Sequence, residues 1–132
     1  MAAYLHSHTK LLTDYDICNV IYNCTADSAY SKYDVYLFNT KGKYNDNKKD
    51  LFESWGYTVE DIPYLKEEIE KQSLKKYISG DYTLDKLDKY GQRINIRIEI
   101  PRKDGSGTVS FITGWMARPN GHIQLATPYG DY

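Results

Sequence analysis

Residues Arg93 to Ile100 constrain the fold of this chain most strongly, because apolar and polar side chains alternate strictly along them. Isoleucine occupies every second position, and arginine, asparagine or glutamate occupies each position between. A period of two over this length is typical of a β-strand with one buried face. The stretch therefore predicts a half-buried strand.

Two more strands are predicted to follow, each introduced by a turn. Residues 103–107 read Lys-Asp-Gly-Ser-Gly, which is typical of a turn. Residues 119–121 read Pro-Asn-Gly, and Asn-Gly readily adopts the positive φ angles of a tight hairpin. The strands beside this hairpin are Val109 to Arg118 and His122 to Thr127. Residues 91–132 are thus predicted to form an antiparallel sheet.

The parity of residues within each strand predicts two faces for this sheet. The face expected to be buried takes Ile94, Ile96, Ile98, Ile112, Met116, Ile123 and Leu125. The opposite face then carries Arg93, Asn95, Arg97, Phe111, Thr113, Trp115, His122 and Gln124. Arginine grips phosphate with a forked guanidinium, histidine transfers protons near neutral pH, and aromatic rings stack on bases. The second face therefore indicates an RNA-binding or RNA-cleaving surface.

A purely structural interpretation of this face stays open. Antiparallel sheets often have one polar, solvated face, and aromatic or charged cross-strand pairs stabilise a sheet without any ligand. Phe111 and Trp115 could instead pack under the N-terminal segment.

The residues before the sheet are predicted to be mainly helical. One helix runs from Asn47 to Trp55, and Gly56 stops it. A longer helix begins at Thr58, whose hydroxyl caps it, and ends at Gly80.

The remaining segments give weaker signals. Residues 4–24 indicate one or two short helices, residues 32–39 a helical turn or a strand, and residues 81–90 a polar connector. The predicted fold is one α+β domain over residues 1–132. Its mainly helical part, residues 1–90, is expected to pack on one face of the antiparallel sheet, residues 91–132.

Composition limits the classes of function. The net charge of −1 provides no overall positive field, so a nucleic-acid site must be a local patch. Cys18 and Cys24 lack metal-ligand or disulfide spacing and are expected to be unpaired thiols. No stretch is apolar enough to span a membrane, and the N-terminus lacks signal-peptide features. The 14 tyrosines favour a contact surface for a partner protein or a stacked ligand.

Cleavage of RNA without a metal requires few groups, because the 2′-hydroxyl of the RNA is itself the nucleophile. A base, an acid and a cation beside the phosphate suffice. His122, Arg97 and Thr113 are the candidates on the sheet, and His6 or His8 is the alternative source of a catalytic histidine. Lys48, in the first turn of a predicted helix, is a further candidate for binding phosphate. No metal or cofactor is expected.

Two regions of the sequence, a C-terminal sheet and the helical half before it, resemble a known class of protein. YGQRINIRIEI and GTVSFITGWMARPNGHIQLATPYGD are similar to a sheet found at the C-termini of large bacterial polymorphic toxins, including contact-dependent growth inhibition effectors. KYDVYLFNTKGKYNDNKKDLFESWGYTVED resembles the helical half that precedes it. The resemblance covers residues 32–132, and Thr113-Gly114-Trp115 and the terminal ATPYGD are its most specific parts.

The resemblance implies a toxin ribonuclease of the barnase, EndoU, colicin and RelE type. Such domains cleave RNA without a metal, and many act on tRNA. A cognate immunity protein neutralises them, and some require a translation factor of the target cell. The chain would then be secreted or delivered from a cell surface and act in the cytoplasm of a target bacterium.

Within this interpretation, the catalytic candidates are His122, Arg97, Thr113 and His6. The RNA-binding candidates are Arg93, Lys48, Trp115, Gln124 and Phe111. The alternative is a protein-binding module without enzymatic activity, either an effector tip or an antitoxin-like partner, whose tyrosines serve recognition. Another toxin chemistry, such as ADP-ribosyl transfer, has no nicotinamide-binding motif to support it.

Overall fold

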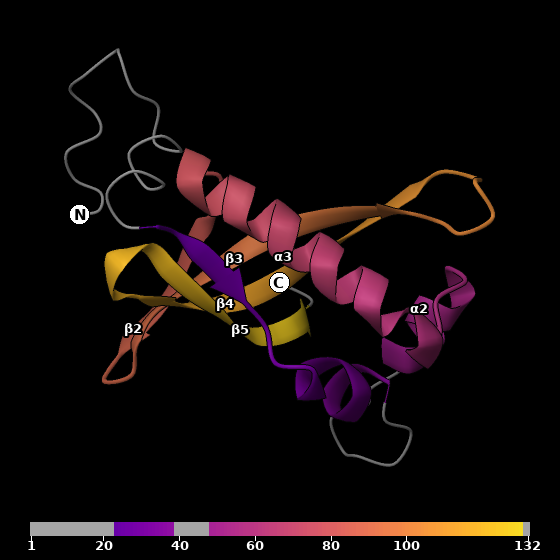
Figure 1. The fold of residues 1–132 in the computed structure, drawn as a ribbon, viewed down its shortest axis with the longest axis horizontal. Coiled ribbons are helices and arrows are strands. Elements are labelled where there is room, and N and C mark those ends of the chain that lie inside the picture. Colours follow the sequence, from indigo (N-terminus) through magenta and orange to yellow (C-terminus); the bar gives the residue numbers. More distant parts are fainter. Residues whose placement is uncertain (1–22, 39–47, 131–132) are drawn as a thin grey trace.

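The structure, a computed structural model, describes residues 23–38 and 48–130 (Figure 1). Among these residues the chain is α+β. In chain order the elements are β1 (Thr25–Asp27), the π-helical turn η3 (Lys32–Leu37), α2 (Lys48–Ser54), the 3-10 turn η4 (Val59–Asp61), α3 (Ile62–Ser79), β2 (Thr83–Asp88), β3 (Gly91–Pro101), β4 (Thr108–Arg118), the turn η5 (Pro119–Gly121) and β5 (His122–Gly130).

The sheet has five strands in the order β1-β5-β4-β3-β2. Strands β2 to β5 pair antiparallel, whereas β1 pairs parallel to β5. The expectation of a purely antiparallel sheet was therefore wrong, because a strand from the N-terminal part completes one edge. The order of helices first and strands afterwards was wrong for the same reason.

Strand β2 replaces the polar connector expected over residues 81–90. Five of its six residues are exposed, so the segment shows no alternation between buried and exposed side chains. Its strand conformation comes from pairing with β3 and leaves no trace in hydrophobic periodicity.

Of the predicted ends of the long helix, Gly80 is confirmed, whereas Thr58 caps the 3-10 turn η4 that leads into α3, whose own N-cap is Asp61. The hydroxyl of Thr58 accepts a hydrogen bond from the backbone of Glu60, and the Asp61 carboxylate accepts one from the backbone of Thr58, which completes a capping box. Gly80 ends α3 in the left-handed conformation, with φ of 80°. The helix predicted over residues 47–55 is confirmed over Lys48–Ser54 as α2, and residues 32–37 form a helical turn.

The hairpin between β4 and β5 is confirmed as well. Asn120 and Gly121 have φ angles of 65° and 82°, as the Asn-Gly sequence predicts. The short helices expected in residues 4–24 lie mostly outside the described residues, as does Cys18. Cys24 is buried and forms no disulfide.

One hydrophobic cluster joins the sheet to the helices. The isoleucines of β3 at positions 94, 96, 98 and 100 are buried, and Ile62, Leu65 and Ile69 of α3 belong to the same cluster. Figure 1 shows α3 running across the sheet. The side of the sheet that carries these isoleucines is called the core face below, and the opposite side is called the outer face.

The pairing of β3 with β4 overturns part of the predicted division of faces. Ile94 lies opposite Trp115, and Ile98 lies opposite Phe111, so both aromatic rings belong to the core face. Ile112 and Met116, expected on the same face as the isoleucines, have the parity of the outer face, although Met116 is buried as expected, with 6% of its surface exposed. Strand β4 carries large apolar residues at both parities, so its parity is ambiguous in the sequence. The bulkier aromatic side chains take the core positions.

Side chains of α3 satisfy part of the edge of β3 that β2 leaves unpaired. The Gln72 amide donates to the Glu99 carbonyl (2.6 Å) and accepts from the Glu99 backbone N–H (3.0 Å), as a neighbouring strand would. The Lys76 amine donates to the Arg97 carbonyl (2.5 Å). Covering an edge in this way hinders pairing with other strands.

Candidate nucleic-acid interface

Polar side chains of three strands form a row at the β4–β5 hairpin end of the outer face. Thr25 of β1, His122 of β5 and Arg118 of β4 are successive partners across the sheet. Side chains directly opposite on neighbouring strands lie about 5 Å apart at Cβ. The row therefore brings a hydroxyl, an imidazole and a guanidinium together.

His122 is held by a hydrogen bond within this row. Its Nδ1 lies 2.6 Å from the Thr25 hydroxyl oxygen, and the ring is half-buried. A bond at one ring nitrogen fixes the orientation of the ring and leaves Nε2 as the nitrogen that faces a ligand. This base and its orienting group are the arrangement that proton transfer requires.

Arg118 is anchored in two directions. Its Nε donates to the Gln124 side-chain oxygen (2.9 Å), and one terminal nitrogen donates to the Tyr90 carbonyl (3.1 Å). Gln124 belongs to the adjacent row, in which Asp27, Gln124, Met116 and Arg93 are successive partners. The sheet thus brings together the predicted residues His122, Gln124 and Arg93, and adds Arg118.

Two other predicted residues lie apart from this group. Arg97 is on the outer face but four residues along β3 from Arg93, about 14 Å away at ~3.4 Å per residue, and it donates a hydrogen bond to the Ser110 hydroxyl (3.2 Å). Lys48 is in α2, where its amine contacts the Tyr36 hydroxyl (3.3 Å) and ring. Phe52 of α2 contacts Phe111, whose ring belongs to the core face, so Lys48 lies on an element that is not part of the row.

The remaining predicted sheet residues are buried. Thr113 and Trp115 have no exposed surface, and Phe111 is 3% exposed and packs against Phe52. Stacking a base on either ring would require the core to open, so the expected exposure of these three side chains was wrong. His6 lies outside the described residues, and so does His8.

A buried chain of hydrogen bonds explains the Thr-Gly-Trp sequence. The Thr113 hydroxyl donates to the Ile96 carbonyl (2.9 Å) and accepts from Trp115 Nε1 (2.8 Å). A buried indole N–H needs an acceptor, and a hydroxyl two residues earlier on the same face supplies it. The motif most specific to the resemblance is therefore part of the core packing.

A second polar network fixes the segment that follows β1. The Glu70 carboxylate of α3 accepts from the Ser28 backbone N–H (2.9 Å) and hydroxyl (2.5 Å), and from the Lys66 amine (2.6 Å). The Tyr33 hydroxyl donates to the Ser28 hydroxyl (3.0 Å), and burial raises the pKa of Tyr33. This network ties the end of β1 to α3 and so holds Thr25 beside His122.

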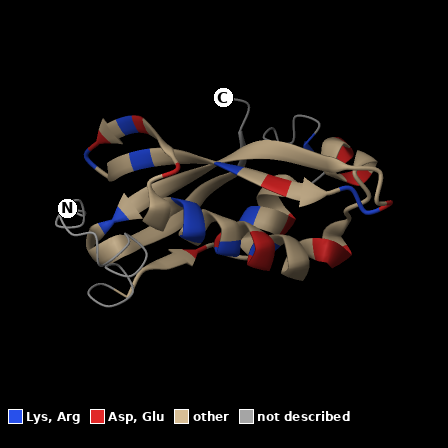
Figure 2. Cartoon of the chain, turned by 90° about the horizontal axis from the view of Figure 1, so that it is seen from above, with Lys and Arg blue, Asp and Glu red and all other residues tan. Residues whose placement is uncertain are grey.

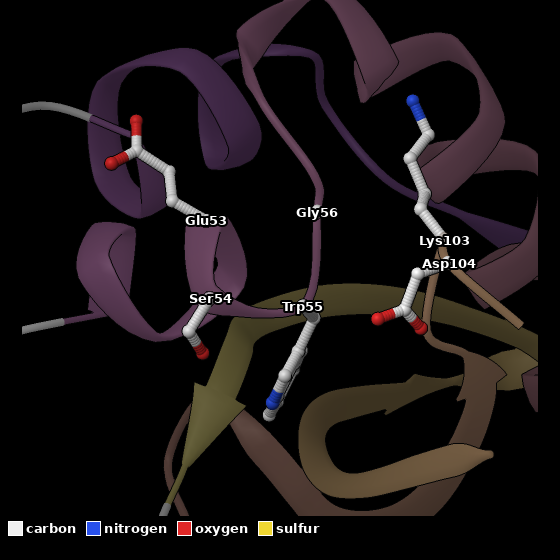
Figure 3. A pocket seen from close by; sticks show the side chains of 6 residues that line it. All are labelled: Glu53, Ser54, Trp55, Gly56, Lys103 and Asp104. Atoms are coloured by element: carbon white, nitrogen blue, oxygen red, sulfur yellow. The ribbon is translucent and has the colours of Figure 1, made fainter. Parts of the chain in front are cut away.

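A hollow of about 360 Å³ lies between the end of α2 and the β3–β4 turn. It is lined by Glu53, Ser54, Trp55, Gly56, Lys103 and Asp104. Figure 3 shows the Lys103 side chain extending away from Asp104, toward Asp61, whose carboxylate it meets at 2.5 Å. Glu53 pairs with Lys49 at 2.8 Å. Lys103 and Glu53 are thus neutralised by ion pairs, whereas the Arg118 partners are two neutral oxygens, so the hollow is a less suitable anion site than the outer face.

Charges of both signs are mixed over the described helices (Figure 2). The outer face carries Arg93, Arg97 and Arg118 beside the acidic Asp27 and Glu99. The described residues contain no group of three histidine, cysteine or acidic side chains placed to hold a metal ion. Within the same ranges, no helix is long and apolar enough to cross a membrane.

Sequence reasoning missed Thr25 and Arg118. The signal for Arg118 was present, because the residues that flank a tight hairpin turn face each other, and here they are Arg118 and His122. Thr25 had no local signal, since it is 97 residues from its partner and lies in a three-residue strand.

A family model described as Domain of unknown function (DUF6883) matches residues 25–131. The chain belongs to the DUF6883 family. The match begins at Thr25, the first residue of β1, and includes every described helix and strand. The DUF6883 region therefore contains the complete row of Thr25, His122 and Arg118. Comparisons with curated proteins and with solved structures find no significant match.

Proposed function

We propose that this DUF6883 chain is a metal-independent endoribonuclease whose RNA lies across the outer face of the sheet. The observation that carries the proposal is the row at the hairpin end, in which Thr25 fixes His122 at Nδ1 and Arg118 lies directly opposite. A positioned imidazole beside a guanidinium supplies the base and the cation that cleavage of RNA by its own 2′-hydroxyl requires.

The reaction follows from this geometry. His122 Nε2 removes the proton of the 2′-hydroxyl, whose oxygen attacks the adjacent phosphorus. The bond from phosphorus to the 5′-oxygen then breaks, which leaves a 2′,3′-cyclic phosphate on one fragment and, after that oxygen takes up a proton from water, a 5′-hydroxyl on the other. Arg118 stabilises the negative charge that develops on the phosphoryl oxygens.

Neighbouring residues extend the binding surface along the RNA. Arg93 lies in the adjacent row, and Gln124, held by Arg118, presents an amide that can hydrogen-bond a base or a ribose. Arg97, about 14 Å from Arg93 along β3, is positioned for a phosphate further along the RNA. The proposal takes the helices to form one layer on the core face, so that RNA approaches from the opposite side.

The resemblance to polymorphic toxins supports the biological setting of the proposal. In that setting the chain is delivered into a competing bacterium, cleaves tRNA in the cytoplasm, and is neutralised by a cognate immunity protein. A translation factor of the target cell is a candidate helper. The alternative is a protein-binding module. It predicts that RNA stays intact whether or not a translation factor is present.

The test is cleavage of tRNA in a bacterial extract that contains a metal chelator and supplies translation factors. We expect the wild-type chain to release fragments ending in 2′,3′-cyclic phosphate. His122→Ala should slow cleavage roughly 100-fold or more, the usual contribution of a general base, and Arg118→Ala should slow it as well.

Arg102→Ala is the matched control, because Arg102 lies in the β3–β4 turn away from the row. We expect it to cleave like the wild type. Undiminished cleavage by a folded His122→Ala protein would refute the assigned base.

A further inference from the structure

Strand β2 is an edge of the described sheet, and its side chains are unusually exposed. No other described strand pairs with its outward side. Leu84 and Leu87 are 70% and 73% exposed, the highest values among the large apolar residues that the structure describes as exposed. Exposed leucines on an unpaired strand edge are typical of a surface that pairs with another chain.

An irregularity in β2 puts both leucines on the same face. Leu84 pairs with Ile94, and Leu87 pairs with Gln92, so β2 has one extra residue between them. Ile94 and Gln92 share a face of β3, and therefore Leu84 and Leu87 share the core face too. Asp85 and Lys86, which both lie opposite Arg93, are left on the outer face.

The sequence of β2 is complementary to itself when it is reversed. If two copies pair antiparallel about a two-fold axis between Asp85 and Lys86, each leucine lies opposite a leucine of the other copy. Each Asp85 then lies opposite the partner's Lys86. Opposite charges across a strand pair stabilise it, and like charges destabilise it.

Neighbouring registers lack this complementarity. A shift of one position in one direction places Asp85 opposite the partner's Asp85, and a shift in the other direction places Lys86 opposite the partner's Lys86. Both shifts also separate the leucines. The charge pattern thus selects one register out of the three, which is how specific strand pairing is encoded.

We propose that β2 docks a second copy of this chain in this register, so that two sheets join into one. The two-fold axis runs perpendicular to the sheet, so both core faces point the same way and four leucines cluster on that side. The two outer faces are likewise side by side. The inference does not depend on the proposed ribonuclease activity.

A lysine and a bulge on an edge strand are also common devices against unwanted pairing. Protection alone would place charged residues along the edge, but it does not account for two exposed leucines on one face. In the proposed dimer the bulge lies at the two-fold axis, where Asp85 and Lys86 meet their counterparts. The contact is small, so we expect micromolar rather than tighter association.

The experiment is analytical ultracentrifugation of the full chain from low-micromolar to near-millimolar concentration. We expect the wild type to dimerise reversibly. Asp85→Lys and Lys86→Asp should each weaken self-association about tenfold or more, because each places two like-charged pairs at the axis.

Mixing the two single variants provides the decisive arm. In the mixed pair every lysine at these positions faces an aspartate, so a heterodimer should form more tightly than either variant dimerises alone. The double variant Asp85→Lys/Lys86→Asp should dimerise like the wild type for the same reason.

Variants of exposed apolar residues distinguish pairing through β2 from nonspecific hydrophobic association. Leu84→Ser should abolish dimerisation, whereas Val59→Ser is the matched control, since Val59 is 52% exposed in η4. A wild-type chain that stays monomeric throughout would overturn the proposal. Dimerisation that is unchanged in both charge variants, or that Val59→Ser abolishes equally, would overturn it too.

Discussion

Removing the Thr113 hydroxyl tests whether the Thr-Gly-Trp sequence stabilises the hydrophobic core. Thr113→Val keeps the shape of the side chain but leaves Trp115 Nε1 without its acceptor in a position that has no exposed surface. An unsatisfied buried donor costs about 1–3 kcal/mol. At about 4 °C per kcal/mol for a chain of this size, we expect the melting temperature to fall by roughly 4–12 °C.

Urea unfolding followed by tryptophan fluorescence and circular dichroism measures this loss. The urea concentration at the midpoint should fall. The slope of the unfolding free energy against urea concentration should stay unchanged, because the substitution does not alter the surface that unfolding exposes. Thr108→Val is the matched control, since Thr108 is exposed on the same strand, and its effect should stay within about 0.5 kcal/mol.

The hydrogen bond between Thr113 and Trp115 is tested by adding Trp115→Phe, which removes the indole donor. In that background, Thr113→Val should cost about 1 kcal/mol less than in the wild type. Equal stability of Thr113→Val and the wild type would refute the assignment of the hydroxyl as acceptor. A stable Thr113→Val protein that no longer cleaved RNA would show instead that Thr113 acts in catalysis.

Three further outcomes follow from the structure. Gly56→Ala should destabilise the fold by about 2 kcal/mol by urea unfolding, because Gly56 has a φ of +98° and an added Cβ would lie 2.7 Å from Lys103 Cβ. Gln72→Ala should speed hydrogen exchange at the Glu99 amide and cost about 1 kcal/mol, because both its bonds to the β3 edge are lost. The Lys103 hydrogen bond, followed by the Thr58 backbone bond, lowers the pKa of Asp61. The stability advantage over Asp61→Asn should therefore be complete at neutral pH, and urea unfolding should show it shrinking as the pH falls below about 4.

Controls separate the specific causes in these experiments. Gly80→Ala shares the positive φ of Gly56 but meets no atom within 4 Å, so it should cost less. Lys71→Ala changes an exposed residue next to Gln72 and should leave exchange at the β3 edge unchanged. A Gly56→Ala protein no less stable than Gly80→Ala would refute the close approach at Lys103.

The sequence predicted those structural elements that a few neighbouring residues determine. The alternation of β3, the Asn-Gly hairpin, the Thr58 cap and the Gly80 end each depend on a few neighbouring residues, and all four are confirmed. Elements that depend on distant partners were missed. Strand β1 exists through pairing with β5, and β2 through pairing with β3, so neither shows a periodic pattern of its own.

The candidate site was predicted in part for the same reason. His122, Gln124 and Arg93 were placed correctly on the outer face, because their strands alternate clearly or flank the hairpin. Phe111 and Trp115 were placed on the wrong face, since β4 is apolar at both parities. Only the pairing with β3 decides which set enters the core.

The central claim is that His122 makes the outer face a ribonuclease site, and RNA from cells induced for the chain tests it most directly. Total RNA is resolved on a denaturing gel and blotted for tRNAs, with wild type and His122→Ala at equal soluble levels. We predict a discrete tRNA fragment and arrested growth with the wild type, and intact tRNA with His122→Ala. Intact tRNA in wild-type cells, or the same fragment in His122→Ala cells, would contradict the account.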